Sequence, residues 1–389
     1  STCVLRELSV SPCENYIESL LTSCLFVLSF DRDEQKESNM RFRTPIPFGL
    51  LAVFFLVYSS CKNGGVDPPP DTNKADTTSH NFTWRIDTLG DGNGSSLNDI
   101  AIINDTLVYG VGEIYLKDST GQFDPLPYNI ARWNGSKWSV QRATVNYLGN
   151  STTPPLEGIF AFSPTDIWLV GGFPIHGDGT TWTLYQLQDM GLGVSVSKAW
   201  GISSGSMYFV GRNGSIAFYN GSTWKRIDAG TSADFKDIWG QSNVQRILAV
   251  ASSPAETKIV SLANQSVIES LFWPVALRSI WISTSSIAYL SGAGGVWKQR
   301  DSSWKLVEGL QDSIFSGAIR GNSDNDIVVN VGFLAHFNGK TWHRYSEIPS
   351  EFKFYSLAVN QSTIVAVGFT LSGGLFVDKA VVVIGRRIP

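Results

Sequence analysis

The stretch Asn220-Gly221-Ser222-Thr223-Trp224 decides the fold, because its pattern recurs along the chain at a nearly fixed interval. A tight turn followed by tryptophan ends at Trp138, Trp182, Trp224, Trp304 and Trp342. Successive tryptophans lie 44, 42, 80 and 38 residues apart, and the interval of 80 holds a degenerate copy near Asn264-Gln265-Ser266-Val267. A period of about 40 residues built from short strands is typical of a β-propeller with one four-stranded blade per repeat.

A second recurring phrase gives the number of blades. An apolar run that ends in a small residue, such as Met207-Tyr208-Phe209-Val210-Gly211, occurs seven times, and the copies end 59, 40, 40, 41, 40 and 36 residues apart. β-Branched and aromatic residues dominate these runs, as central strands require. A short inner strand precedes each run, as in Asp237-Ile238-Trp239-Gly240. We therefore predict an all-β fold, a seven-bladed β-propeller of four-stranded antiparallel blades.

The two ends of the chain predict how the ring closes. The last blade has apolar strands at 363–368 and 380–384, and the chain then stops without a tryptophan strand. Residues 81–87 match residues 221–228, the tryptophan strand of an earlier repeat. We expect this N-terminal strand to complete the last blade by pairing with 380–384, because closure removes the unpaired edges of an open array.

These repeats resemble those of WD-type and Asp-box-containing propellers of exported bacterial proteins, over residues 82–389. The resemblance implies the fold and no activity. The Trp-Asp pair of true WD repeats is absent, and Asp178-Gly179-Thr180-Thr181-Trp182 is one residue shorter than the Asp-box of sialidase-like proteins.

The segment before the repeats has the composition of an export signal. From Met40, two arginines and an apolar stretch at 47–58 lead to Ser59-Ser60-Cys61, which resembles a bacterial lipoprotein signal. The resemblance implies that Cys61 is lipidated and that the protein is anchored in the cell envelope, at the outer membrane, facing the periplasm or the surface. The alternative is an ordinary signal peptide or membrane anchor with an incidental cysteine.

The predicted organisation follows from this segment. Residues 1–39 are interpreted as a non-native upstream extension, 40–60 as the signal peptide, 61–81 as a flexible linker rich in Pro, Gly, Asp and Asn, and 82–389 as the propeller. All four cysteines precede residue 82, so we expect no disulfide between blades.

The composition favours no particular chemistry. The net charge is −4 without a basic tract, so nucleic acid is not an expected partner. None of the four histidines is paired as His-x-x-x-His, and we predict neither a metal nor a cofactor. His336 is interpreted as a structural histidine, and Asp324-Asn325-Asp326 as a turn. No nucleophile elbow, P-loop or dinucleotide fingerprint is present, so no catalytic residue is assigned.

Length variation points to one face of the ring. The insertion 113–127 and the long connection 141–156 both belong to the face where outer strands lead into the next blade. Function often resides in such loops. We expect the insertion to overhang the channel mouth, where the inner strands begin. The expected ligand-binding residues are Glu113, Tyr115, Lys117, Glu157, Lys198, Lys236 and Arg278. The alternative is that these charges only solvate strand ends.

Two functions remain open from the sequence. The favoured one is a non-enzymatic, monomeric binding propeller that contacts the membrane through a lipid anchor and binds a protein or glycan of the cell envelope. The alternative is a glycan-active hydrolase, lyase or transferase, which would need two carboxylates about 5–10 Å apart in a channel pocket. The repeat tryptophans are interpreted as packing between blades, whereas Trp200, Trp239 and Trp281 on inner strands could pack or bind a ligand.

Overall fold

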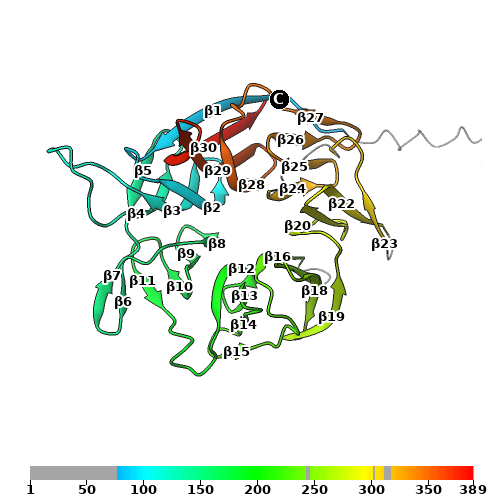
Figure 1. The fold of residues 1–389 in the computed structure, drawn as a ribbon, viewed down its shortest axis with the longest axis horizontal. Helices are drawn as coiled ribbons and strands as arrows, with labels where there is room; N and C mark the ends of the chain where they lie inside the picture. Colours follow the sequence, from blue (N-terminus) through cyan, green and yellow to red (C-terminus); the bar gives the residue numbers. More distant parts are fainter. Residues whose placement is uncertain (1–76, 242–245, 301–302, 311–316, 389) are drawn as a thin grey trace, which may run out of the picture. The chain divides into compact units, whose positions relative to one another are not determined.

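The computed structural model describes residues 77–241, 246–300, 303–310 and 317–388. In this part of the chain, seven four-stranded antiparallel sheets surround a central channel (Figure 1). The predicted all-β, seven-bladed propeller is confirmed. The expectations for the signal segment, Cys61 and the linker up to residue 76 lie outside the described residues. A search of the described residues finds no helix with the length and apolar character needed to cross a membrane.

The strands of blades 1 to 6 follow in chain order from the channel outward. Blade 1 contains β2 (Ser96–Asn104), β3 (Leu107–Ile114), β4 (Tyr128–Trp133) and β5 (Trp138–Gln141). Blade 2 contains β8 (Gly158–Ser163), β9 (Asp166–Val170), β10 (Pro174–Gly177) and β11 (Trp182–Leu184). Blade 3 contains β12 (Ser195–Ser203), β13 (Ser206–Arg212), β14 (Ile216–Tyr219) and β15 (Trp224–Arg226). Between blades 1 and 2 lies the small hairpin of β6 (Val145–Tyr147) and β7 (Asn150–Thr152).

The next three blades repeat the same order. Blade 4 contains β16 (Phe235–Gln241), β17 (Arg246–Ser252), β18 (Thr257–Ala263) and β19 (Ser266–Phe272). Blade 5 contains β20 (Leu277–Ile282), β21 (Ala288–Gly292), β22 (Gly295–Arg300) and β23 (Ser303–Leu306). Blade 6 contains β24 (Ile319–Ser323), β25 (Asp326–Asn330), β26 (Leu334–Phe337) and β27 (Trp342–Arg344).

Blade 7 closes the ring with strands from both parts of the chain. Its order is β28 (Lys353–Val359), β29 (Thr363–Ser372), β30 (Phe376–Arg387) and β1 (Phe82–Leu89). The register runs from Phe82 opposite Arg387 to Leu89 opposite Ala380, which confirms the predicted closure. β29 and β30 are longer than the predicted 363–368 and 380–384, because their hairpin continues beyond the rest of the blade.

The recurring turn motif joins the third strand of a blade to the fourth. The Asn220 side-chain oxygen accepts the backbone N–H groups of Ser222 at 3.0 Å and Thr223 at 2.7 Å. Gly221 has a φ of 94°, which glycine adopts without steric cost. In the degenerate copy of blade 4, Asn264 and Gln265 adopt positive φ values of 49° and 59° in place of the glycine.

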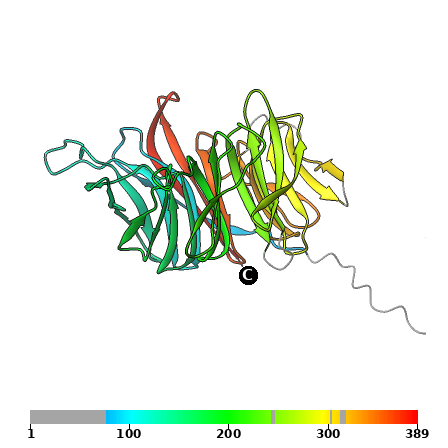
Figure 2. The same cartoon turned by 90° about the horizontal axis from the view of Figure 1, so that it is seen from below.

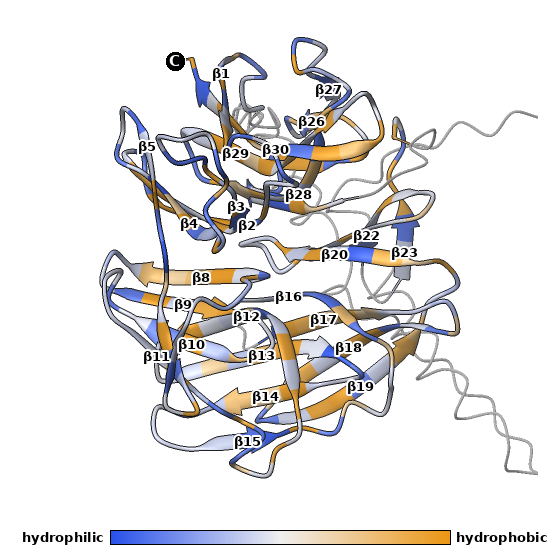
Figure 3. Cartoon of the chain, turned by 60° about the vertical axis from the view of Figure 1, so that its left-hand side comes forward, coloured by the Kyte–Doolittle hydropathy of each residue, from blue (hydrophilic) through white to orange (hydrophobic). Residues whose placement is uncertain are grey.

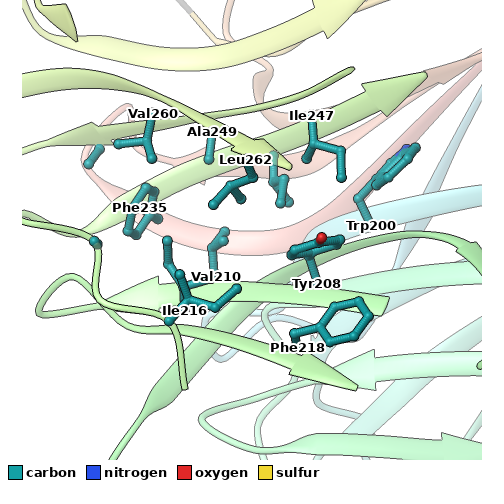
Figure 4. Packing of buried hydrophobic residues seen from close by; sticks show 14 of the residues in the cluster. Trp200, Tyr208, Val210, Ile216, Phe218, Phe235, Ile247, Ala249, Val260 and Leu262 are labelled. Atoms are coloured by element: carbon teal, nitrogen blue, oxygen red, sulfur yellow. The ribbon is translucent and has the colours of Figure 1, made fainter. Parts of the chain in front are cut away.

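The core is divided among the contacts between blades. Each of seven buried hydrophobic clusters draws its residues from two neighbouring blades. Figure 4 shows the cluster between blades 3 and 4, where Tyr208 and Phe218 share one interior with Phe235 and Val260. In Figure 3 the hydrophobic colouring follows the strands, and the turns are more hydrophilic.

The repeat tryptophans pack between blades, as predicted. Each is half-buried against the cluster that its blade shares with the preceding one. Trp84 of β1 takes this place in blade 7, and Val267 takes it in the degenerate repeat of blade 4. The outer strand therefore contributes to the ring by covering the seam with its neighbour.

Candidate functional site

A cavity of about 350 Å³ lies at the mouth of the channel, where the inner strands begin. Four of the seven residues predicted to bind a ligand, one acidic and three basic, line it together: Glu157, Lys198, Lys236 and Arg278. They come from the starts of the inner strands of blades 2 to 5, which the ring brings to one place. These strand starts therefore do face a shared space.

Two ion pairs join blades across the channel, and three of their four residues line this cavity. Lys198 Nζ lies 2.7 Å from an Asp99 carboxylate oxygen, and Arg320 binds both oxygens of Asp237 at 2.8 and 3.0 Å. Each pair skips one blade, so Lys198 of blade 3 reaches blade 1 and Arg320 of blade 6 reaches blade 4. Lys198, Asp237 and Arg320 also line a second cavity of about 210 Å³ farther along the inner strands. The ion pairs thus lie between the mouth and the deeper channel.

The two aspartates also join adjacent blades through their backbones. Asp99 accepts the N–H of Ile100 at 3.0 Å and, across the seam, that of Ile159 at 3.3 Å. Asp237 repeats this arrangement in blade 4 with Ile238 and Ile280 of the next blade. Sequence analysis did not single out these aspartates, although a carboxylate inside an apolar inner strand was a visible signal.

Asp237 is held ionised. Burial alone would raise its pKa, but the Arg320 charge and hydrogen bonds outweigh burial and keep the pKa below the ordinary value. A general acid of a glycan-active enzyme needs the opposite shift, so that it carries a proton at neutral pH. The geometry therefore suits Asp237 to structural bracing.

The mouth carries an excess of positive charge. Its described lining contains five basic side chains, Lys198, Arg212, Lys236, Arg278 and Arg320, and three carboxylates, Glu157, Asp234 and Asp237. Arg212 pairs with Glu157 at 2.7 Å, and Lys236 lies 3.4 Å from Asp234. Arg278 is exposed and makes no hydrogen bond or ion pair with any other described residue. This guanidinium is therefore available to bind a negatively charged group that enters the mouth.

The inserted loop does not contribute to this cavity. Glu113, Tyr115 and Lys117 are not among the residues that line the cavity, and the β3–β4 connection projects outward from the ring in Figure 1. The Lys117 backbone N–H donates to Asp91 at 2.9 Å. Asp124 pairs with Arg142 at 2.7 Å. These contacts hold the loop on the outer connections of blade 1.

The three inner-strand tryptophans are mainly packing residues. Trp200 is 6% exposed and lies so close to Gly240 of the next blade that a Cβ there would be 2.5 Å from the indole. Trp281 is 3% exposed and packs on the following blade in the same way. Trp239 is half-buried, and the Arg320 guanidinium lies 4.5 Å from its ring centre. All three tryptophans also line a cavity of about 350 Å³ at the other ends of the inner strands.

A Ser-His-Asp cluster between blades 2 and 3 is not a catalytic triad. Asp166 and the Ser204 hydroxyl both contact His176 at Nε2, at 2.8 and 3.2 Å, whereas a triad uses the two ring nitrogens separately. In blade 6, the fully buried His336 contacts Asp326 at 2.8 Å, which agrees with its interpretation as a structural histidine. The described residues contain no group of three His, Cys, Asp or Glu suited to hold a metal ion.

The comparisons with known proteins give similarity in fold. No family model and no curated protein sequence matches the chain. Among solved structures, YCF48 bound to a D1 peptide is 14% identical with a TM-score of 0.59, covering 82% of this chain and 100% of that one. The WD40 propeller of Doa1 is 13% identical with a TM-score of 0.56, covering 78% and 97%. The WD40 repeats of RRP9 are 10% identical with a TM-score of 0.56, covering 79% and 100%.

Proposed function

We propose that the chain is a non-catalytic binding propeller that holds an acidic segment of a partner polypeptide in the channel mouth. The observation that carries the proposal is the excess of basic side chains there, with Arg278 exposed and unengaged by other described residues. Guanidinium and ammonium groups bind carboxylates through charge-assisted hydrogen bonds, which are stronger than neutral ones. A partner carboxylate is the group that this mouth fits best.

A polypeptide is favoured over a glycan for two reasons. Tyr355 forms part of the mouth wall, and its ring centre lies 5.0 Å from that of Phe369 with the rings tilted by 47°, so apolar surface adjoins the basic groups. A peptide side chain supplies such an apolar partner more readily than a neutral sugar. The similar fold of YCF48 was solved with a D1 peptide, so this scaffold is compatible with peptide binding.

The carboxylates of the channel are poorly suited to catalysis. Asp99 accepts hydrogen bonds from Lys198, the Ser356 hydroxyl and two backbone N–H groups. Asp237 is similarly engaged and has a lowered pKa. Groups with all lone pairs occupied serve poorly as nucleophile or general acid, which removes the support for a glycan-active enzyme.

The cellular setting is proposed from the sequence before the ring. Ser59-Ser60-Cys61 after an apolar stretch supports lipidation of Cys61 and anchoring in the cell envelope. Mass spectrometry of the natively produced protein tests this, with a diacylated cysteine at position 61 as the expected N-terminus. Cys61→Ser should move the protein from the membrane to the soluble fraction. An unmodified Cys61 would contradict the proposal.

The binding proposal is tested with a fluorescently labelled glutamate-rich peptide and a counterpart in which glutamines replace the glutamates. Anisotropy should show binding of the first only, with an affinity that falls as salt rises. Arg278→Ala should weaken binding about tenfold or more, the worth of a hydrogen bond to a charged group. Lys137→Ala is the matched control, because Lys137 lies in an exposed turn after β4. Equal binding of both peptides, or an unchanged affinity in Arg278→Ala, would contradict the proposal.

A further inference from the structure

The longest strand pair in the ring extends beyond its own blade. β28 pairs with β29 only as far as Lys353 opposite Phe369, and β1 pairs with β30 only from Leu89 opposite Ala380. Residues 370–379 therefore form a two-stranded hairpin with no described strand beside either edge. Figure 2 shows this hairpin, in red, rising on the side opposite the C-terminus.

The tip of this hairpin is apolar and fully accessible. Leu375 is 80% exposed, Phe376 is 74% exposed and Val377 is 36% exposed. Gly373 and Gly374 form the turn with positive φ values of 57° and 76°. The tip lies outside all seven core clusters, so the packing of the ring does not account for these side chains. A contiguous exposed apolar group of this kind marks an interaction surface.

The hairpin is continuous with the basic mouth. Both lie on the face of the ring where second strands lead into third strands and where inner strands begin. Phe369, at the base of the hairpin, contacts Tyr355 with the two rings tilted by 47°, and Tyr355 lines the mouth and is 43% exposed. An aromatic wall thus joins the cationic groups around Arg278 to the apolar tip.

We propose that the hairpin tip, residues 373–377, is the apolar half of the binding face, and that the ligand is an extended polypeptide segment combining acidic and large apolar residues. This rests on the proposed function of the mouth. A carboxylate of the segment binds the basic groups, while a neighbouring leucine or phenylalanine packs on Leu375 and Phe376. The edge of β29 at 370–372 lies along this path and offers backbone groups to an extended chain.

A polypeptide is favoured here over a lipid surface. The flanking residues of the tip, Asp378 and Lys379, carry opposite charges, whereas a membrane-inserting loop is rimmed by basic residues that attract anionic lipids. The described chain begins at the face of the ring opposite the hairpin. Phe82 pairs with Arg387, at the end of β30 that lies away from the hairpin. The unpaired Arg278 guanidinium at the mouth and the apolar tip together match an acidic and apolar segment.

The test uses two glutamate-rich peptides of equal charge, one otherwise polar and one with a leucine and a phenylalanine after the glutamates. The unaltered protein should bind the apolar version about tenfold more tightly, as expected for burying one large side chain. The double variant L375S/F376S should lose that preference and keep its affinity for the polar peptide. R278A should weaken both peptides. I268S/F272S is the matched control, because Ile268 and Phe272 are 66% and 64% exposed on β19 of blade 4.

The outcomes separate the two proposals. Binding of both peptides with equal affinity, or a preference that L375S/F376S retains, overturns the hairpin proposal and leaves the basic mouth standing. Failure of both peptides to bind overturns both. Sedimentation with vesicles of phosphatidylethanolamine and phosphatidylglycerol that is lost in L375S/F376S would assign the tip to a lipid surface and also overturn the hairpin proposal. An unchanged thermal transition of L375S/F376S confirms that the substitutions leave the ring folded.

Discussion

Replacing Arg320 with methionine should destabilise the ring more than the same change at Lys198, although both cations cross the channel. The Arg320 and Asp237 side chains are 13% and 5% exposed, and two hydrogen bonds join them. The Lys198 and Asp99 side chains are 20% and 10% exposed and share one bond. Leaving a buried charge without its partner costs about 3–5 kcal/mol. We expect that loss for Arg320→Met and about 1.5–3 kcal/mol, the worth of one charged hydrogen bond, for Lys198→Met.

Urea unfolding followed by far-ultraviolet circular dichroism measures both losses. The double variant R320M/D237N should recover part of the loss, because a neutral amide leaves no charge buried. The pKa of Asp237 is lower in the folded protein than in the unfolded chain, so the contribution of Arg320 is present above about pH 4 and is lost as the pH falls through the folded-state pKa. The gap between the unaltered protein and R320M should therefore narrow in acid. This account would be refuted if R320M lowered the free energy of unfolding by less than about 1 kcal/mol at pH 7, or if K198M lowered it by more than R320M does.

Three further predictions concern the ring and its closure. Trp224→Ala should lower the free energy of unfolding by about 3 kcal/mol, because the indole covers the contact between blades 2 and 3. Lys225→Ala should leave that free energy unchanged, and urea titration measures both variants. Deleting residues 77–89 should lower the melting temperature by more than about 10 °C, because it removes β1. Deleting residues 62–76 should leave the melting temperature unchanged. Equal melting temperatures for the two deletions would contradict the observed closure. Burial, with the nearby His336, His343 and Arg387 charges, lowers the pKa of His80 to about 4, so the free energy of unfolding should fall as the pH drops from about 6.5 towards 4. In His80→Asn, the melting temperature should change less across that pH range.

The repeated features of the fold could be predicted because the same residue pattern recurs at a regular interval in the sequence. The turn at Asn220-Gly221, the apolar second strand and Trp224 recur at equivalent positions, so each copy supports the others. Even the degenerate copy kept enough of the pattern to be placed, with Val267 packing where other blades use tryptophan. Closure was predictable for the same reason, since residues 82–87 carry the missing element of the repeat.

The ion pairs of the channel could not be predicted, because each depends on which blades face one another across the ring. Asp99 and Lys198 are 99 residues apart, and their pairing skips blade 2. Arg320 stands where blades 3 to 5 carry tryptophan, and nothing in the repeat indicates that it turns towards Asp237. Such contacts are set by side-chain length and channel width, which a local pattern does not contain.

The residues that line the cavity were predicted in part for a related reason. The starts of inner strands meet at the mouth because the repeat fixes their position, so Glu157, Lys198, Lys236 and Arg278 line one cavity. The insertion 113–127 is outside the repeat, and its own contacts with Asp91 and Arg142 decide where it lies. The hairpin at 370–379 was missed because its apolar strands look like those of any blade, and only the register shows that they outrun their neighbours.

The proposed binding face and the start of the described chain lie on opposite faces of the ring. The described chain begins beside the far end of β30, where Ser79 and His80 contact Arg387 and His336, and the mouth and hairpin lie at the other ends of the strands. The first described residues therefore lie at the face opposite the basic cavity. The proposed binding face is therefore not covered by the start of the described chain, and an extended polypeptide can reach the basic cavity and the hairpin tip from the same side of the ring.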